Sequence, residues 1–311
     1  MKIKKIIYVY TFSFFSSYCY NPQYFCTAAN AKYFDGLKAL IGSIHKSNFD
    51  HLGQIAVFNL GLTKKQIDEI NSMEKVKVYE VKLTHPDLLK PFNVFGNKWV
   101  PGWYAWKPVV IKQALDLFPY VVWQDAGNLT FRPLDDLFTH IIQKGYFLNR
   151  AGNLNKNHTT HYIIKKFNLD SQNNKWILEL PQVEAGLIGI SRTCTIAYEK
   201  FLLPVYELTK DLKNFEDDGT CPLGFGWARY EQPLFTMLAY QLGLEIFTKY
   251  KKPTQIYLHV DNQKIPFYLD SPKGFDENTH ITFRISFMRQ EFINYIRYKK
   301  ITFLPQKKYV I

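Results

Sequence analysis

Apolar and polar positions become regular from Gln23 onward. The stretch YFCTAAN (24–30) predicts a short strand that ends in small polar residues. The stretch YFDGLKALIGSIHKSN (33–48) then carries apolar residues at helical spacing, which predicts an amphipathic helix. The residues on its apolar face are Phe34, Leu37, Leu40, Ile41 and Ile44.

Two more strands and one more helix continue this alternation. QIAVFNLG (54–61) and VKVYEVKL (76–83) predict strands. Between them, TKKQIDEINSM (63–73) predicts a helix with Thr63 as its N-cap and with Ile67 and Ile70 on its buried side. Strand, helix, strand, helix and strand in this order predict a right-handed parallel α/β sheet.

A further strand of the same sheet ends in an acid. After a loop rich in proline, glycine and aromatic residues (86–102), WYAWKPVVIKQALDLFP (103–119) predicts a helix with Pro108 in its first turn. It leads into YVVWQ (120–124), an apolar run typical of a strand buried on both faces. Asp125 follows directly. Because open parallel sheets bind ligands beyond the carboxyl ends of their strands, we expect Asp125 to face a cleft.

The second half of the chain gives a less regular pattern. It predicts a strand at VEAGLIGIS (183–191), a helix interrupted near Pro204 (195–215), a glycine-rich loop running into a helix (222–244), and late strands at IYLHV (256–260) and ITFRISF (281–287). A basic tail follows. No internal repeat or linker divides the chain, so we expect residues 21–311 to form one domain.

Composition allows a large folded domain. The chain has 311 residues, of which 47% are hydrophobic, so it can bury a substantial core. The net charge of +12 favours anionic partners such as nucleotide diphosphates, acidic glycans or membrane surfaces, and it equally fits a solvated face that keeps the protein soluble. A nucleic-acid binder would rest on this charge alone, since no recognised nucleic-acid-binding module is present.

The first twenty residues have the layout of a signal peptide. Three lysines precede the apolar stretch IIYVYTFSFF, and small residues follow it. The apolar part is too short for a transmembrane span of about 20 residues. We expect residues 1–20 to direct the chain into the secretory pathway or out of the cytoplasm. A retained signal-anchor and a buried N-terminal strand are the alternatives.

The cysteines give neither a disulfide framework nor a zinc motif. Cys19 lies in the leader, which leaves Cys26, Cys194 and Cys221, an odd number without paired metal-type spacing. One disulfide with a free thiol, or three buried thiols, both fit.

The order of these segments resembles that of a known enzyme family. YFCTAANAKYFDGLKALIGSI, IAVFNLGLTKKQIDEI, WKPVVIKQAL and VVWQDAGNLTFRPLDDLF, taken in sequence, resemble the GT-A nucleotide-sugar transferases. The likeness is to the family-8 glycosyltransferases and to the capsule-synthase-like transferases with a WKP…WxDaG pattern, and it covers roughly 23–244. It implies an α/β fold of GT-A type, with a mixed, mostly parallel sheet flanked by helices.

The resemblance also implies a donor-binding loop after the first strand. In the family, a Thr-Ser-Asp type loop there holds the nucleotide base. Thr27 matches this loop, Ala28, Ala29 and Asn30 replace its polar positions, and Tyr33 keeps its aromatic residue. We therefore expect Thr27, Ala28, Asn30 and Tyr33 to bind the donor.

Asp125 matches the first residue of the family's Asp-x-Asp motif. That motif holds a divalent cation, Mn²⁺ or Mg²⁺, which neutralises the departing diphosphate. Here Ala126 intervenes and Gly127 stands where the second carboxylate would be. Three alternatives follow. Asp125 holds a metal with help from Asn128 or a distant residue, or fixed cations neutralise the diphosphate without a metal. In the third, the site has lost catalysis. The fixed cations in question are Lys107, Arg132 and Arg284.

Two later segments resemble the family's sugar-contacting elements. EAGLIGI is similar to a strand beside the donor sugar, which implies that Glu184, Ala185 and Gly186 line that pocket. RYEQPLF resembles a segment opening the next helix, which puts Glu231 and Gln232 at the sugar as candidate catalytic residues. Glu231 equally fits a helix-start acid favoured by the macrodipole. The family's late histidine motif is not matched, and His259 is its nearest substitute and more typical of a structural residue.

Lys107 lies at the start of a predicted helix, where free backbone N–H groups and the charge of the lysine itself would bind an anion. It fits a donor-binding residue and an exposed surface lysine equally well. Taken together, the resemblance implies a glycosyltransferase that acts on a nucleotide-sugar donor and a glycan or protein acceptor. The alternative is a noncatalytic secreted carbohydrate-binding or interaction protein on the same fold, and the missing second Asp is what favours it.

Overall fold

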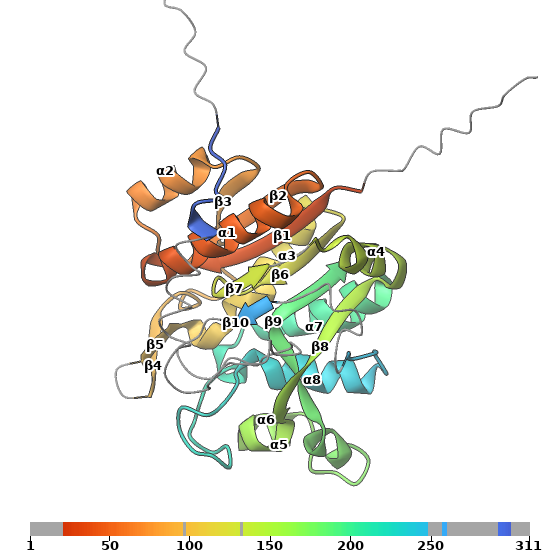
Figure 1. Ribbon diagram of the computed structural model, residues 1–311. Helices are drawn as coiled ribbons and strands as arrows, with labels where there is room; N and C mark the ends of the chain where they lie inside the picture. Colours follow the sequence, from red (N-terminus) through yellow and green to blue (C-terminus); the bar gives the residue numbers. More distant parts are fainter. Residues whose placement is uncertain (1–20, 96–97, 131–132, 248–256, 260–291, 300–311) are drawn as a thin grey trace, which may run out of the picture.

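The computed structural model describes residues 21–95, 98–130, 133–247, 257–259 and 292–299. Its centre is a six-stranded sheet in the order β3–β2–β1–β6–β9–β8 (Figure 1). The strands are β1 (Gln23–Ala29), β2 (Leu52–Asn59), β3 (Val76–Glu80), β6 (Tyr120–Gln124), β8 (Tyr146–Leu154) and β9 (Pro181–Ser191). Only β9 of these six runs against the others, since it pairs antiparallel with both β6 and β8. The predicted mixed, mostly parallel sheet is confirmed.

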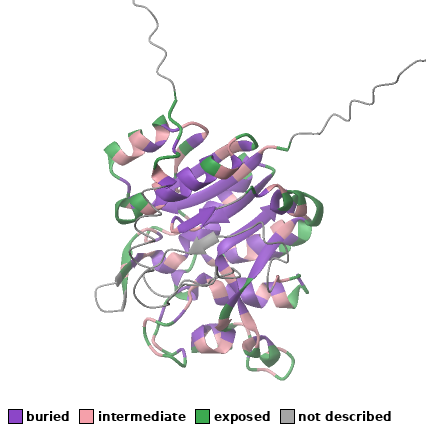
Figure 2. Cartoon of the chain, in the orientation of Figure 1, coloured by how far each residue is buried: buried purple, intermediate pink, exposed green. Residues whose placement is uncertain are grey.

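Helices cover both faces of the sheet. The helices on one face are α1 (Phe34–Asn48), α2 (Lys64–Ser72) and α4 (Asp135–Lys144). Those on the other are α3 (Trp106–Leu117), a π-helical segment (Ile196–Leu202), α7 (Leu203–Leu208) and α8 (Glu231–Gln241). Side chains alternate along β1 as a strand requires: Phe25 and Ala29 join the α1 core, whereas Cys26 and Ala28 join the α3 core. The sheet is therefore buried between two apolar layers (Figure 2).

Local sequence signals explain where several elements begin and end. Thr63 caps α2, and its side chain accepts from the Gln66 backbone N–H while the Gln66 side chain accepts from the Thr63 N–H. Pro108 lies in the first turn of α3, as predicted. The helix expected at 195–215 is broken as anticipated, with Pro204 at the start of α7.

The structure adds elements that the sequence pattern did not predict. The loop expected at 86–102 contains a hairpin of β4 (Pro91–Phe95) and β5 (Lys98–Pro101). β8 was not predicted. Of the late strands, the first is the short β10 (Tyr257–His259), which pairs with β7 (Asn128–Thr130), and the one expected at 281–287 lies outside the described residues.

Short elements complete the described chain. They are α5 (Asn155–His158), α6 (His161–Lys166), and 3₁₀ turns at Ala31–Tyr33, Gly102–Tyr104, Lys175–Glu179 and Leu212–Asn214. The segment 292–299 returns to the sheet edge, where Tyr298 forms an antiparallel bridge with Met73 and the Glu74 N–H donates to the Arg297 carbonyl at 2.8 Å. Cys26, Cys194 and Cys221 are free thiols, which agrees with the second of the two cysteine alternatives except that Cys194 is only partly buried. Within the described ranges, no helix is both long and apolar enough to cross a membrane.

Candidate active site

Asp125 lies at the carboxyl end of β6, and it faces a pocket. β6 is buried throughout, whereas the Asp125 side chain is 25% exposed. The pocket encloses about 640 Å³ of space between atoms, and part of that space is open to solvent. The chain ends its central strand with this acid because the side chain projects into a cavity instead of the core.

Four segments line the pocket, and most of the lining is apolar or aromatic. The residues are Ala28, Ala29, Asn30 and Tyr33 at and after the end of β1, Leu60 after β2, Trp99, Val100, Pro101, Tyr104 and Trp106 from the hairpin to α3, and Trp123, Asp125, Ala126 and Gly127 around the end of β6. Of the residues expected to bind the donor base, the structure brings Ala28, Asn30 and Tyr33 to the pocket. Thr27 is not among the lining residues, because its side chain is buried on the α1 face of β1.

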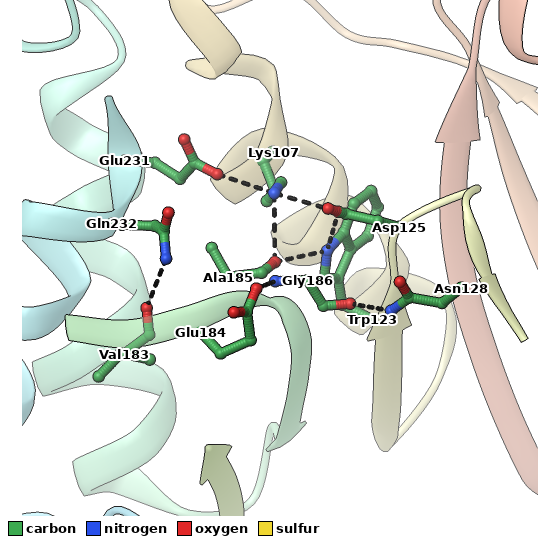
Figure 3. Close-up of polar contacts among 10 residues, drawn as sticks. All are labelled: Lys107, Trp123, Asp125, Asn128, Val183, Glu184, Ala185, Gly186, Glu231 and Gln232. Carbon is green, nitrogen blue, oxygen red and sulfur yellow. Dashed lines mark hydrogen bonds and ion pairs between the residues drawn. The ribbon is translucent and has the colours of Figure 1, made fainter. Parts of the chain in front are cut away.

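Lys107 joins the two carboxylates that the sequence placed in the site. Its Nζ lies 3.1 Å from Asp125 Oδ1 and 2.8 Å from Glu231 Oε1 (Figure 3). The lysine side chain is only 4% exposed, so it is not a surface lysine. It rises from the first turn of α3, whereas Asp125 follows β6 and Glu231 opens α8. Three elements distant in sequence thus meet at one buried ammonium group.

The electrostatics of this triad follow from burial and pairing. Burial alone would lower the pKa of Lys107, but the carboxylates of Asp125 and Glu231 outweigh burial and raise the pKa above its usual value. Burial raises the pKa of Glu231, and the nearby Lys107 charge opposes that rise without cancelling it. With both acids ionised, the triad carries a net charge of −1.

Backbone carbonyls of β9 hold the triad in place. The Ala185 carbonyl accepts from Lys107 Nζ at 3.2 Å and from Trp123 Nε1 at 3.0 Å. Trp123 Nε1 also donates to Asp125 Oδ1 at 3.0 Å. The Gly186 carbonyl accepts from the Asp125 N–H at 3.1 Å and from Asn128 Nδ2 at 2.7 Å. Ala185 and Gly186 therefore brace the site residues, and neither lines the described pocket.

The two neighbouring polar candidates are also tied to β9. The Glu184 carboxylate accepts from the Gly186 N–H at 3.0 Å. Gln232 Nε2 donates to the Val183 carbonyl at 2.9 Å, which anchors the start of α8 on the strand (Figure 3). Gln232 thus lies beside Glu231 and helps to fix where α8 begins.

Strained backbone surrounds the triad. Trp103 and Tyr104 have φ of 52° and 61°, and Tyr230, directly before Glu231, has φ 52° and ψ −100°. The Gln232 N–H donates to the Arg229 carbonyl at 2.9 Å, so Tyr230 occupies a turn position that glycine normally takes. A backbone conformation of this kind costs about 1–3 kcal/mol of folding free energy per residue, and it persists only where the surrounding packing holds it in place. The packing here is aromatic, because the Tyr230 ring centroid lies 5.2 Å from that of Tyr104 and 6.0 Å from that of Trp103.

The described residues do not make a complete cage for a divalent cation. Asp125 is the only acid of the broken Asp-x-Asp motif, and its Oδ1 already takes contacts from an ammonium and an indole N–H. No group of three His, Cys, Asp or Glu side chains suited to a metal occurs in the described part of the chain. Asn128 is fully buried, and its Oδ1 has no hydrogen-bond partner. The backbone of His259 lies opposite Asn128 in the β7–β10 ladder. Arg132 and Arg284, the other candidate cations, lie outside the described residues.

The structure brings the predicted acids and the lysine together, but the aromatic residues of the pocket wall were not predicted from the sequence. Trp99, Tyr104 and Trp106 form much of the pocket, yet single aromatic residues carry little information in a chain with 17% aromatics. The WKP stretch contains one of them, so its spacing before Asp125 was the available signal.

Comparison with known proteins supports the architecture. No protein-family model matches the chain, and no curated protein matches it. The solved structure of the mannosyltransferase Ktr4p from S. cerevisiae is similar, with a TM-score of 0.50, 11% identity, and coverage of 76% of this chain and 70% of that one. The apo form of the glycosyltransferase GlyE from Streptococcus pneumoniae TIGR4 is similar with a TM-score of 0.49 and 12% identity. The likeness covers 90% of this chain and 66% of GlyE.

The bifunctional glycosyltransferase WbbM gives a TM-score of 0.44 and 10% identity, with 75% of this chain covered. The chain spans 39% of the length of WbbM and 66% of that of GlyE. At 11% identity, the likeness to Ktr4p concerns the fold. The chain therefore has the GT-A fold of nucleotide-sugar glycosyltransferases.

Proposed function

We propose that this protein is a glycosyltransferase that moves a sugar from a nucleoside-diphosphate donor to an acceptor hydroxyl. The observation that carries the proposal is the Asp125–Lys107–Glu231 triad, in which Lys107 and Glu231 are buried and Asp125 reaches a pocket at the carboxyl end of the central strand. Ligands of open α/β sheets bind at that edge. A lysine kept charged between two acids, beside a cavity, is an arrangement that a merely structural helix start does not require.

The pocket suits the nucleoside half of such a donor. Tyr33, Trp99 and Trp106 offer aromatic faces on which a base can stack, and Asn30 adds a polar amide. Ala126 and Gly127 have little or no side chain, so a diphosphate can approach the backbone after β6 closely. The donor sugar would then lie toward the triad, because Asp125 belongs to both the pocket and the triad.

The triad's charge suits the transition state of the transfer. The bond between the anomeric carbon and the diphosphate oxygen breaks, its electron pair leaves with the diphosphate, and the acceptor oxygen bonds to the anomeric carbon as its proton departs. Positive charge develops on the sugar meanwhile. Carboxylates held at a fixed distance stabilise that charge without reorganisation. Lys107 keeps the two acids together despite their repulsion.

Lys107 is not a free counter-charge for the diphosphate, because two carboxylates already surround it. The neutralising charge then comes from a divalent cation at Asp125 or from basic residues such as Arg132 and Arg284. Among the described residues, the oxygen ligands around Asp125 are too few to hold a divalent cation by themselves. Mn²⁺ or Mg²⁺ use stays a prediction, which the following experiment compares with a metal-independent mechanism.

Calorimetric titration with UDP and GDP, each with Mn²⁺ or with EDTA, tests the proposal. We expect one nucleotide to bind the wild type, and Asp125→Asn to weaken that binding about tenfold or more if the carboxylate engages the donor or its counter-ion. Asp116→Asn is the matched control, because Asp116 is a surface acid paired with Lys112 on α3. Dependence on Mn²⁺ supports the metal; equal binding in EDTA supports basic residues. If neither UDP nor GDP binds the wild type, either with Mn²⁺ or with EDTA, the proposal is contradicted.

A noncatalytic carbohydrate-binding protein is the second candidate, and Gly127 favours it by leaving the motif with one acid. That candidate binds saccharides without consuming any nucleotide-sugar. We further propose that the chain is exported. The apolar stretch of residues 1–20 supports this, and its removal would take three lysines from the net charge of +12. N-terminal sequencing of the mature protein tests export, and a retained Met1 in an expression host with a secretion pathway contradicts cleavage.

A further inference from the structure

The loop of residues 216–230, which leads from the 3₁₀ turn at Leu212–Asn214 into α8, presents apolar side chains to solvent. Leu223, Phe225 and Trp227 are 48%, 45% and 48% exposed. They occupy alternate positions of a short segment, CPLGFGW, so three large apolar groups are gathered on one loop. Clustered exposed apolar residues of this kind mark binding surfaces more often than single ones do.

The exposure is a fixed property of the loop, because hydrogen bonds pin its backbone. The buried Asp217 carboxylate accepts from the Gly219 N–H at 3.0 Å and from the Gly226 N–H at 2.7 Å. The Thr220 hydroxyl accepts from the His161 N–H at 2.8 Å. The Trp227 carbonyl lies 2.7 Å from His158 Nδ1. A loop tied at both ends and across its middle holds its aromatic faces in place before a ligand arrives.

The loop is continuous with the proposed active site. It ends at Tyr230, whose ring packs on Tyr104, a residue of the pocket wall, and the next residue is Glu231 of the triad. In Figure 1 the loop emerges on the same side of the molecule as the β4–β5 hairpin. The C-terminal end of the loop therefore lies beside the triad.

The loop's charge selects among possible occupants. Residues 216–230 contain three acids, Glu216, Asp217 and Asp218, and one base, Arg229, which gives a net charge of −2 in a chain of +12. An anionic lipid surface or an acidic polymer would meet repulsion here. A neutral glycan suits both features: its C–H faces pack on electron-rich aromatic rings, and its hydroxyls donate to carboxylates such as the exposed Glu216.

We propose that the 216–230 loop is the acceptor subsite, and that Phe225 and Trp227 stack on a pyranose ring of a neutral glycan acceptor. The role of the bound glycan as an acceptor rests on the proposed function. The binding of a neutral saccharide to the loop does not depend on donor chemistry, so it can be measured separately.

The experiment uses the full chain and four neutral probes: lactose, maltotriose, chitotriose and mannotriose. Each is titrated while tryptophan fluorescence is followed, and saccharide affinity is confirmed by calorimetry. The variants are Trp227→Ala and Phe225→Ala. The matched control is Trp176→Ala, because Trp176 is 46% exposed but lies on the separate 3₁₀ turn at Lys175–Glu179.

We expect at least one probe to bind, and Trp227→Ala to weaken it about tenfold, equivalent to about 1.4 kcal/mol. Phe225→Ala should act in the same direction, and Trp176→Ala should bind as the wild type does. In a transfer assay the loop variants should raise KM for the saccharide while their nucleotide affinity equals that of the wild type.

Three results would overturn the inference. They are no response of the wild type to any probe, equal saccharide affinity in Trp227→Ala and Trp176→Ala, and loop-dependent binding to phosphatidylserine vesicles instead of saccharides. The proposed function fails on a different measurement, the absence of nucleotide binding. Saccharide binding lost in Trp227→Ala, in a protein that binds no nucleotide, would keep the loop site and remove the transferase.

Discussion

Replacing Lys107 by methionine should destabilise the protein severely. The ammonium is the buried partner of two carboxylates, and its loss leaves Glu231, itself buried, with an acid beside it and no cation. Removing one member of a buried ion pair typically costs about 3–5 kcal/mol, and we expect that loss in the free energy of unfolding measured by urea denaturation. Lys112→Met is the control on the same helix, because Lys112 forms a partly exposed i,i+4 pair with Asp116 and should lose less than about 1 kcal/mol.

The pH dependence of this loss identifies the stranded acid. Burial raises the pKa of Glu231 above its ordinary 4.5, so the folded state binds a proton more readily than the unfolded state does. Its stability contribution is then present below pH 4.5 and is lost as the pH rises through the folded pKa. Without Lys107 the pKa rises further. Lys107→Met should therefore be destabilised less in mildly acidic solution than at neutral pH.

A second variant separates stranded charge from lost packing. Adding Glu231→Gln to Lys107→Met removes the buried charge, and it should recover about 1 kcal/mol or more at neutral pH. If Lys107→Met costs less than about 1 kcal/mol, or if Glu231→Gln recovers nothing, then the triad is not the buried charged unit described above.

Three further changes test the surrounding structure. Tyr230→Gly should have a free energy of unfolding about 1–3 kcal/mol higher than Tyr230→Ala in urea denaturation, because both variants lose the ring but only glycine relieves the strained backbone. A lower value for Tyr230→Gly would show that the backbone is not strained. Gly42→Ala places a methyl 1.9 Å from the Phe292 carbonyl, so limited proteolysis should release the C-terminal segment faster, and an unchanged cleavage rate would contradict that contact. Thr63→Ala should cost about 1 kcal/mol by losing the cap on Gln66, and a loss below the error of denaturation would contradict the capping box.

Periodicity and capping were enough to predict the parallel half of the fold. β1, β2, β3 and β6 are bounded by turn residues and joined by helices with clear apolar faces, so each element could be read locally. β8 could not. Its central residues alternate poorly, with Asn149 and Arg150 in the strand, and its place depends on pairing with β9 across two register shifts. Non-local pairing of that kind leaves little trace in a local window.

Some features of the candidate site could also be predicted from the sequence, and others could not. Asp125 was predictable because a strand end on a parallel sheet fixes where its side chain goes. The link from Lys107 to Glu231 was not, since it joins α3 to the start of α8 and depends on how both helices pack on the sheet. Thr27 shows the limit of motif matching, because the pleat of β1 turns it toward α1 and away from the pocket.

Turnover of nucleotide-sugars tests the central claim most directly. Wild-type protein and Asp125→Asn are incubated with a panel of UDP- and GDP-sugars, with Mn²⁺ or with EDTA and with the neutral saccharide probes, and the release of nucleoside diphosphate is measured. We predict that the wild type consumes at least one donor and that Asp125→Asn loses most of this activity. Release of no diphosphate by the wild type from any donor, in either condition, would contradict it.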